Sequence, residues 1–166
     1  MTRTRTVRIR RARPDEAAEL TALALRSKAH WGYDEAFMAA CVAELTLAAD
    51  EIAARRTAVA ESDDGRVLGL ATLEGAPPHG ELGLMFVDPE AMGLGVGRLL
   101  FAHVRATAAA TGFTTVRWAA DPNAVPFYEA MGGRRTGAIP SGSVPGRTLP
   151  LMELTVRPRA TPPEAG

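Results

Sequence analysis

The residues whose types and spacing most clearly suggest a chemical role form a glycine-rich turn between an apolar run and a helical run. The turn reads Val87-Asp88-Pro89-Glu90-Ala91-Met92-Gly93-Leu94-Gly95-Val96-Gly97-Arg98. Glycine lets the backbone come close to a ligand, and the free amides at a helix start, backed by the helix dipole, bind pyrophosphate oxygens. Arg98 could add a charged contact. The turn therefore predicts a site for a phosphate-bearing ligand.

Two other interpretations of these glycines stay open. Three glycines can simply permit tight packing of a helix on a strand. A dinucleotide-binding fingerprint would need glycine in place of Arg98 and an acidic residue about 20 residues further along the chain. Asp121 imitates that acid, whereas Arg98 breaks the pattern. A nucleotide-binding regulator would use the same turn for a dinucleotide.

A second informative segment follows the next predicted strand and reads Asp121-Pro122-Asn123-Ala124-Val125-Pro126-Phe127-Tyr128-Glu129-Ala130-Met131-Gly132-Gly133. Its helix is expected to begin at Asn123, because that cap leaves Pro126 in the first turn, where the missing amide hydrogen costs little. A cap at Asp121 would place the proline too deep, and Gly132 suits the helix end. Helical spacing rotates Tyr128 about 100° away from the apolar face of this helix.

Apolar periodicity and turn residues predict the elements that must position these segments. Strands are expected at 7–9, 57–60, 67–73, 81–87, 114–119 and 147–156, with a tight turn at 63–65. Helices are expected from 14 to about 32, from about 34 to 47, from 95 to 112 and from 123 to 132. The alternation of strands and helices around the glycine turn indicates an α/β (α+β) fold.

Length and composition limit the class of protein. The 166 residues fit one domain, which we place at 1–157, followed by a loose proline-rich tail at 158–166. Lysine plus arginine equals aspartate plus glutamate, 19 against 19, so no overall field would hold nucleic acid or an anionic membrane. No apolar run reaches the ~18 residues of a membrane span, and no secretory signal follows the arginine-rich N-terminus. The lone Cys41 and three scattered histidines favour a reducing, cytoplasmic location without a disulfide or metal cluster.

Together the two motifs resemble the GNAT superfamily of N-acetyltransferases. In that family a turn of the type Arg/Gln-x-x-Gly-x-Gly/Ala binds the coenzyme A pyrophosphate, and an Asn…Phe-Tyr…Gly helix follows the next strand. Here the turn aligns as Met92-x-x-Gly95-x-Gly97, so Met92 departs from the usual arginine or glutamine and leaves the contact to backbone amides. The resemblance covers nearly the whole chain and implies a mixed central sheet of six to seven strands with a splayed centre, flanked by about four helices.

The resemblance also implies acetyl-CoA as the cosubstrate and no metal. It assigns backbone contacts with the pantetheine arm to the strand before the turn, and a further contact with that arm to Asn123. The implied coenzyme-binding residues are Met85, Phe86, Val87, Met92, Gly93, Leu94, Gly95, Val96, Gly97, Arg98, Asn123, Phe127 and Tyr128.

Acetyl transfer to an amine defines two catalytic roles. An alkyl ammonium has a pKa of ~10.4, so a base or a chain of water molecules must remove a proton before the nitrogen attacks a thioester. Glu81 stands at the beginning of the central strand, where the resemblance places a glutamate in histone-type members. Tyr128 matches the tyrosine that members commonly use as the general acid for the departing thiolate. The alternative for Glu81 is an exposed carboxylate at a strand end, and the alternative for Tyr128 is a tyrosine that only packs at the edge of the core.

The expected acceptor is a small-molecule or peptide amine. Family members usually recognise it through the first two helices and the final strands, which here implicates His30, Trp31, Tyr33, Ser141 and Ser143. Trp31 and Tyr33 could instead form hydrophobic contacts that join two helices. The stretch at 141–147 could suit a polar or carboxylate-bearing acceptor, or it could be a plain loop. A noncatalytic acyl-CoA-binding module or sensor is the alternative to an enzyme, and a homodimer is left open.

Overall fold

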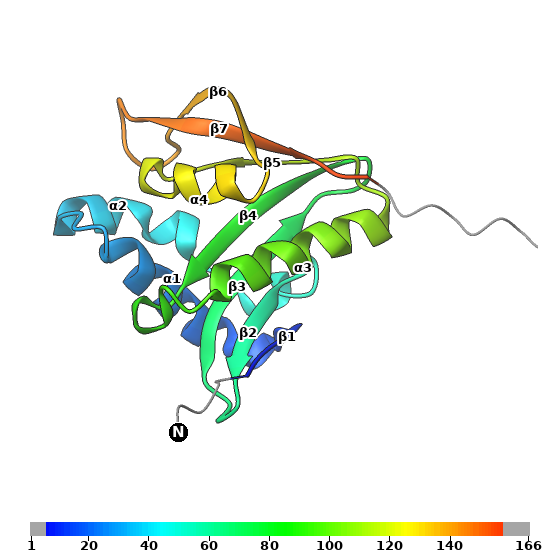
Figure 1. The fold of residues 1–166 in the computed structure, drawn as a ribbon. Helices are drawn as coiled ribbons and strands as arrows, with labels where there is room; N and C mark the ends of the chain where they lie inside the picture. The colour runs from blue at the N-terminus through cyan, green and yellow to red at the C-terminus, as the bar shows by residue number, and fades with distance from the viewer. Residues whose placement is uncertain (1–5, 158–166) are drawn as a thin grey trace, which may run out of the picture.

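The computed structural model describes residues 6–157, so the expected tail at 158–166 lies outside the described residues. The strands are β1 (Val7–Arg11), β2 (Ala58–Ser62), β3 (Val67–Glu74), β4 (His79–Val87), β5 (Thr115–Ala119), β6 (Arg134–Pro140) and β7 (Thr148–Thr155). The helices are α1 (Ala17–Ala29), α2 (Glu35–Leu45), α3 (Val96–Thr111) and α4 (Val125–Ala130), with 3₁₀ turns η1 (Pro14–Glu16), η2 (Ala49–Glu51), η3 (Pro89–Ala91) and η4 (Pro122–Ala124). The strands form one mixed sheet in the order β1-β2-β3-β4-β5-β7-β6, which confirms the predicted fold class (Figure 1).

The sheet is split between β4 and β5. These two strands are parallel and pair only through His79, Gly80 and Glu81 of β4, whereas every other neighbouring pair is antiparallel. Beyond Glu81, within residues 6–157, no strand pairs with this edge of β4, although its other edge stays paired with β3 as far as Val87. Backbone groups along the open edge are therefore available to a ligand that extends beside them like a strand.

Two hydrophobic cores cover the two faces of the sheet. On one face, Leu20 and Leu23 of α1 pack with Leu70 of β3. On the other face, Leu100 and Phe101 of α3 pack in the second core, and α3 crosses in front of the sheet in Figure 1. The two faces alternate along each strand, as the pleat requires. Helices on both faces hold the two halves of the sheet in place around the split.

The expected cap of the last helix is wrong. Asp121, not Asn123, caps the segment, because its carboxylate accepts a hydrogen bond from the Asn123 amide at 2.9 Å. This cap belongs to the 3₁₀ turn η4, and α4 begins only at Val125. Pro126 consequently still lies in the first turn of the α-helix, so an Asp121 cap places no proline in the helix interior.

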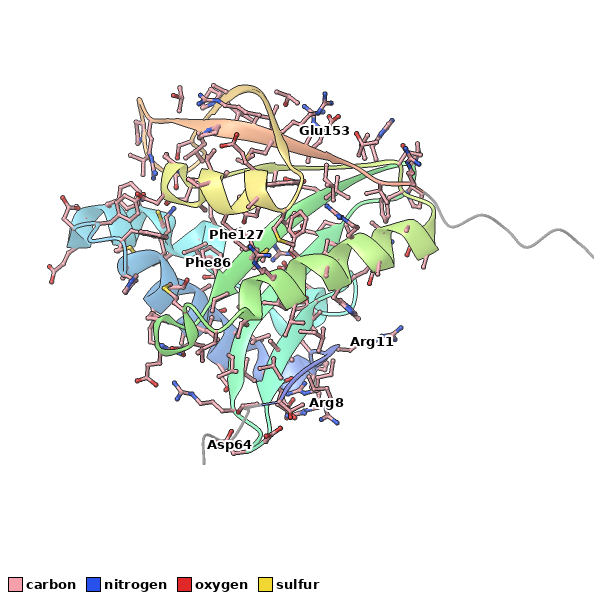
Figure 2. The ribbon with its side chains drawn as sticks, in the orientation of Figure 1. Arg8, Arg11, Asp64, Phe86, Phe127 and Glu153 are labelled. Atoms are coloured by element: carbon pink, nitrogen blue, oxygen red, sulfur yellow. The ribbon has the colours of Figure 1, made fainter. Side chains whose placement is uncertain are left out.

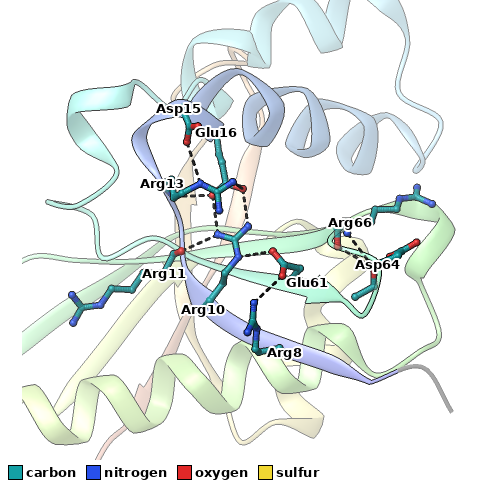
Figure 3. A network of polar contacts seen from close by, with 10 residues as sticks. Arg8, Arg10, Arg11, Arg13, Asp15, Glu16, Glu61, Asp64 and Arg66 are labelled. Carbon is teal, nitrogen blue, oxygen red and sulfur yellow. Dashed lines mark hydrogen bonds and ion pairs between the residues drawn. The ribbon is translucent and has the colours of Figure 1, made fainter.

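Carboxylates neutralise the arginine-rich first strand. Arg10 donates two hydrogen bonds of 2.9 Å to Glu16 and one of 2.6 Å to Glu61, which also binds Arg8 at 2.9 Å (Figure 3). The Arg10 hydrogen bonds lower the pKa of Glu16 to about 2, against the opposing effect of burial, with help from the Arg13 amide. This network joins β1 to β2 and to the turn before α1, which gives these arginines a structural role.

Two kinds of feature are missing from the described part of the chain. None of its helices is both long and apolar enough to cross a membrane. No group of three or more histidine, cysteine, aspartate or glutamate side chains within residues 6–157 is arranged to hold a metal ion. Cys41 is buried in the core beneath α1 and α2, as its small apolar neighbours indicate.

Candidate active site

A cavity of about 890 Å³ lies along the open edge of β4. The expected coenzyme-binding residues that line it are Met85, Phe86, Val87, Met92, Gly93, Gly95, Val96, Gly97, Arg98, Asn123, Phe127 and Tyr128. Figure 2 labels Phe86 on β4 and Phe127 on α4 among them. Leu94 lies outside the lining and is 54% exposed. The glycine turn and the second motif, which are separated in sequence, therefore share one cavity.

The glycine turn is open toward this cavity. Gly93 and Gly95 both have φ of +82°, a left-handed conformation that side chains disfavour, and a Cβ atom on either would meet nothing within 4 Å. Gly95 caps α3 without a side-chain hydrogen bond, so the first amides of the helix keep no intrahelical partner. Gly97 packs closely instead, since its Cβ would lie 3.2 Å from the Phe127 ring. These features fit a diphosphate bound by backbone amides.

Asp88 holds the turn in place from behind. This buried carboxylate accepts hydrogen bonds from the Glu90 amide at 3.0 Å and from Arg26 of α1 at 2.9 Å. Burial alone would raise the pKa of Asp88, but the Glu90 amide and the Arg26 guanidinium lower it below its ordinary value. The charged form is thereby favoured, and it fixes the start of η3 against α1.

Glu81 lies at the opposite end of the open edge from the glycine turn. It is the last β4 residue that pairs with β5, and a rise of about 3.3 Å per residue places it roughly 20 Å from Val87 along the strand. Between these ends a bulge places Gly83 and Leu84 opposite the single residue Thr72, whose hydroxyl accepts a hydrogen bond from the Leu84 amide at 2.8 Å. Because bulges bend strands, this one helps β4 part from β5.

Tyr128 forms part of the cavity wall and is only 7% exposed. Its ring packs against Trp118 of β5, Phe101 of α3 and its neighbour Phe127, with centroid distances of 5.0, 6.1 and 5.3 Å. Burial raises the pKa of the phenol well above its ordinary value, and the negative charge of Asp121 raises it further. The hydroxyl is therefore protonated at neutral pH, so it can donate a proton but is a poor base.

A polar hub around Asp121 connects the two halves of the sheet. The Asp121 carboxylate accepts hydrogen bonds from Lys28 of α1 at 2.6 Å and from the Tyr33 hydroxyl at 2.7 Å. Arg147, before β7, donates to the same Tyr33 oxygen at 3.0 Å, and Asn123 donates to it at 3.2 Å. Burial raises the pKa of Tyr33, and its hydrogen bond to Asp121 adds to the increase. The hub fixes the segment that leads into α4 and Tyr128.

The expected acceptor residues are distributed unevenly. Trp31 lines the cavity, whereas His30, Tyr33, Ser141 and Ser143 do not. Tyr33 is committed to the hub and stacks on a phenylalanine of α2, with ring centroids 4.0 Å apart. Ser143 reaches across to α2 by donating a hydrogen bond to a glutamate there at 3.1 Å. Any direct role of these residues in acceptor binding stays a prediction.

Several side chains that line the cavity were not predicted from the sequence as site residues, namely Glu44, Arg55, Glu74 and Trp118. Glu74 lies in register with Glu81 across β3 and β4, so correct pairing of this hairpin would have found it. Its carboxylate accepts a hydrogen bond from Arg55 at 3.0 Å and lies over Gly83, where any side chain would collide with it. Glu44, Arg55 and Trp118 reach the cavity only through tertiary packing, for which the local sequence carries no signal.

Comparisons with known proteins agree with this geometry. Residues 18–133 match the acetyltransferase (GNAT) family. The chain is 31% identical over 151 residues to the peptidyl-lysine N-acetyltransferase YjaB of Salmonella typhimurium, covering 89% of this chain and 97% of that protein. Its fold is similar to apo YjaB from Escherichia coli, with TM-score 0.65 and 25% identity over 90% of this chain and 97% of that one.

A second solved structure carries the coenzyme. PaiA N-acetyltransferase from Thermoplasma acidophilum, in complex with coenzyme A, has TM-score 0.75 and 18% identity over 90% of this chain and 99% of that one. At that identity the likeness concerns the fold alone. The split sheet, the open glycine turn and the sequence match lead to one conclusion: the chain belongs to the GNAT family and is an acetyl-CoA-dependent N-acetyltransferase.

Proposed function

We propose that this enzyme transfers the acetyl group to a primary amine by direct attack, with Tyr128 as the general acid and Glu81 as the base. The observation that carries the proposal is that the glycine turn, the open edge of β4, Glu81 and Tyr128 all line one cavity. A donor held by its diphosphate at the turn and extended along β4 lies between the base and the acid. No covalent enzyme intermediate is needed.

The residues present fit acetyl-CoA as the donor. Backbone amides at Gly93–Gly97 bind the diphosphate, and Arg98 adds a cation at the same end of the cavity. The free backbone groups of Met85, Phe86 and Val87 pair with the amides of the pantetheine arm. Met92 lines the cavity and contributes apolar contact where other members place arginine or glutamine. Backbone contacts therefore replace side-chain contacts at the diphosphate.

Glu81 and Tyr128 carry out the two proton transfers of the reaction that involve the protein. Glu81 takes a proton from the acceptor ammonium, and the neutral nitrogen forms a bond with the thioester carbonyl carbon. The adduct releases its second nitrogen proton to solvent, and the carbon–sulfur bond breaks. Tyr128 gives its phenolic proton to the departing thiolate and regains one from solvent, and Glu81 releases the proton that it took to solvent, which restores both side chains. The high pKa of this phenol favours a protonated donor at the start of each cycle.

A lysine side chain is the first acceptor to test. The relative in Salmonella typhimurium is a peptidyl-lysine N-acetyltransferase. Glu81 lines the acceptor end of the cavity and takes part in no ion pair within residues 6–157, so its carboxylate is available to attract an alkyl ammonium. Small alkylamines provide the same reacting group without a peptide, so the two can be compared directly.

The Tyr128→Phe variant tests the acid. It keeps the ring that packs on Trp118 and Phe101 and removes only the hydroxyl, which makes none of the hydrogen bonds found within residues 6–157. We expect kcat to fall at least about tenfold, while calorimetry gives an unchanged Kd for acetyl-CoA. Unchanged turnover in Tyr128→Phe would reject the acid role.

The Glu81→Gln variant tests the base through its dependence on pH. Without a base the reaction depends on amine that is already neutral, a fraction that grows about tenfold per pH unit below ~10.4. We therefore expect a large loss of kcat/KM at pH 7 that diminishes as pH rises. Glu129→Gln, on the exposed side of α4, is the charge-matched control. A loss that is equal at every pH would argue against proton removal by Glu81.

A further inference from the structure

Charge is arranged in opposing pairs over much of the cavity wall. The charged lining residues are Lys28, Glu44, Arg55, Glu74, Glu81, Arg98 and Asp121. Four of them neutralise one another, because Lys28 binds Asp121 at 2.6 Å and Arg55 binds Glu74 at 3.0 Å. Their mutual attraction leaves little net charge for a ligand.

The other three charged residues take part in no ion pair within residues 6–157. Arg98 lies at the glycine-turn end, where the donor diphosphate binds. Glu81 and Glu44 lie on β4 and α2, on the other side of the reacting centre. The cavity is therefore positive at the donor end and negative at the acceptor end, which favours an acceptor that is positively charged.

Glu44 has no role in the proposed chemistry, yet its surroundings strengthen its negative potential. It lies next to Leu45, the last residue of α2, and no basic side chain occupies that final turn. The negative end of the helix dipole thus adds to the charge of the carboxylate. Glu44 accepts a hydrogen bond from Ser143 at 3.1 Å, which holds its carboxylate at the cavity wall without neutralising it.

We propose that Glu44 is a specificity residue, which selects acceptors that carry a second positive charge besides the reacting amine. The inference rests on the proposed function, because the first amine must reach Glu81 and the thioester. Such an acceptor carries two cationic groups on one flexible chain. A free α,ω-diamine supplies it, and so does a peptide lysine beside a second basic residue.

The test compares acceptors of similar length by kcat/KM at saturating acetyl-CoA. We expect cadaverine to exceed pentylamine by roughly three- to tenfold after its two equivalent amines are counted, with zwitterionic aminocaproate, whose second group is a carboxylate, poorest. Added salt should reduce this preference, because salt screens exposed charges. A lysine peptide with neighbouring arginines, compared with one carrying glutamines, distinguishes a peptide source from a free diamine.

Variants at the helix end complete the experiment. Glu44→Gln keeps an oxygen for Ser143 but should abolish the preference for cadaverine, and Glu44→Lys should reverse it in favour of aminocaproate. Glu35→Gln removes the same charge from the exposed start of α2 and should leave the preference intact. Acetylation of all three amines with equal kcat/KM, or equal effects of Glu44→Gln on all three, would overturn this inference alone. Absence of acetylation of every amine and peptide would overturn the proposed function and this inference together.

Discussion

Replacement of Asp121 by asparagine should weaken the link between the two halves of the sheet. One carboxylate oxygen accepts hydrogen bonds from Lys28 and Tyr33, and the other accepts from the amide and the side chain of Asn123. Asparagine has nearly the same shape, but it offers an NH₂ group in place of one of these acceptors and carries no charge. At least one donor of the hub must then lose its partner.

The expected loss follows from the exposure of the pair. The Lys28 and Asp121 side chains are each 12% exposed, so their interaction is shielded from solvent more than a surface ion pair. Hydrogen bonds to charged groups contribute about 1.5–3 kcal/mol each, and two such contacts change in the variant. We therefore expect the free energy of unfolding to fall by about 3–5 kcal/mol in Asp121→Asn, which is also the cost of removing one partner of a buried ion pair.

The assay is urea denaturation at pH 7 on four proteins, namely wild type, Asp121→Asn, Lys28→Met and the double variant. The double-mutant cycle should give a coupling energy of about 1–2 kcal/mol between Lys28 and Asp121. Burial alone would raise the pKa of Asp121, but its hydrogen bonds from Lys28 and Tyr33 lower it. The contribution of Asp121 to the free energy of unfolding should thus be complete above its pKa in the unfolded chain, ~3.9, and should decrease as pH falls below that value. A total loss under ~0.5 kcal/mol, the range of ordinary surface changes, would refute the reasoning.

Two further variants test other parts of the structure. Gly97→Ala would place a Cβ 3.2 Å from the Phe127 ring, so acetyl-CoA should bind roughly tenfold more weakly by calorimetry, while Gly137→Ala, with nothing within 4 Å, should not change it. Glu16→Gln should cost about 2 kcal/mol of unfolding free energy at pH 7, and the difference from wild type should shrink as pH falls from ~4.5 toward ~2, because wild-type Glu16 also becomes protonated. Asp15→Asn, at a side chain 77% exposed, is its control. A Glu16→Gln deficit independent of pH would contradict the ion-pair account.

The fold could be predicted largely because its signals are local. Glycines at 95 and 112 mark both ends of α3, and apolar alternation marks the strands that these ends connect. The glycine turn and Tyr128 could be assigned to one site through the joint pattern of two motifs. The cap at Asp121 could not be predicted from the sequence. The choice between a 3₁₀ turn and an α-helix over three residues depends on weak hydrogen bonds of nearly equal energy.

The acceptor end was less predictable for a different reason. Glu44 and Arg55 reach the cavity from α2 and from the segment before β2, so their positions depend on how helices pack on the sheet. Tyr33 was expected to face an acceptor, but its hydroxyl is bound within the hub. Sequence identifies which side chains can bind, whereas tertiary packing decides which of them remain free to do so.

Hydrogen–deuterium exchange with and without coenzyme A tests most directly where the donor binds. We predict slower exchange in peptides that cover 82–98, because the ligand would occupy amides along the open edge of β4 and at the glycine turn. Peptides from β1 and β2 should exchange at unchanged rates, since no residue of these two strands lines the cavity. Tight binding of coenzyme A without protection at 82–98 would contradict the account.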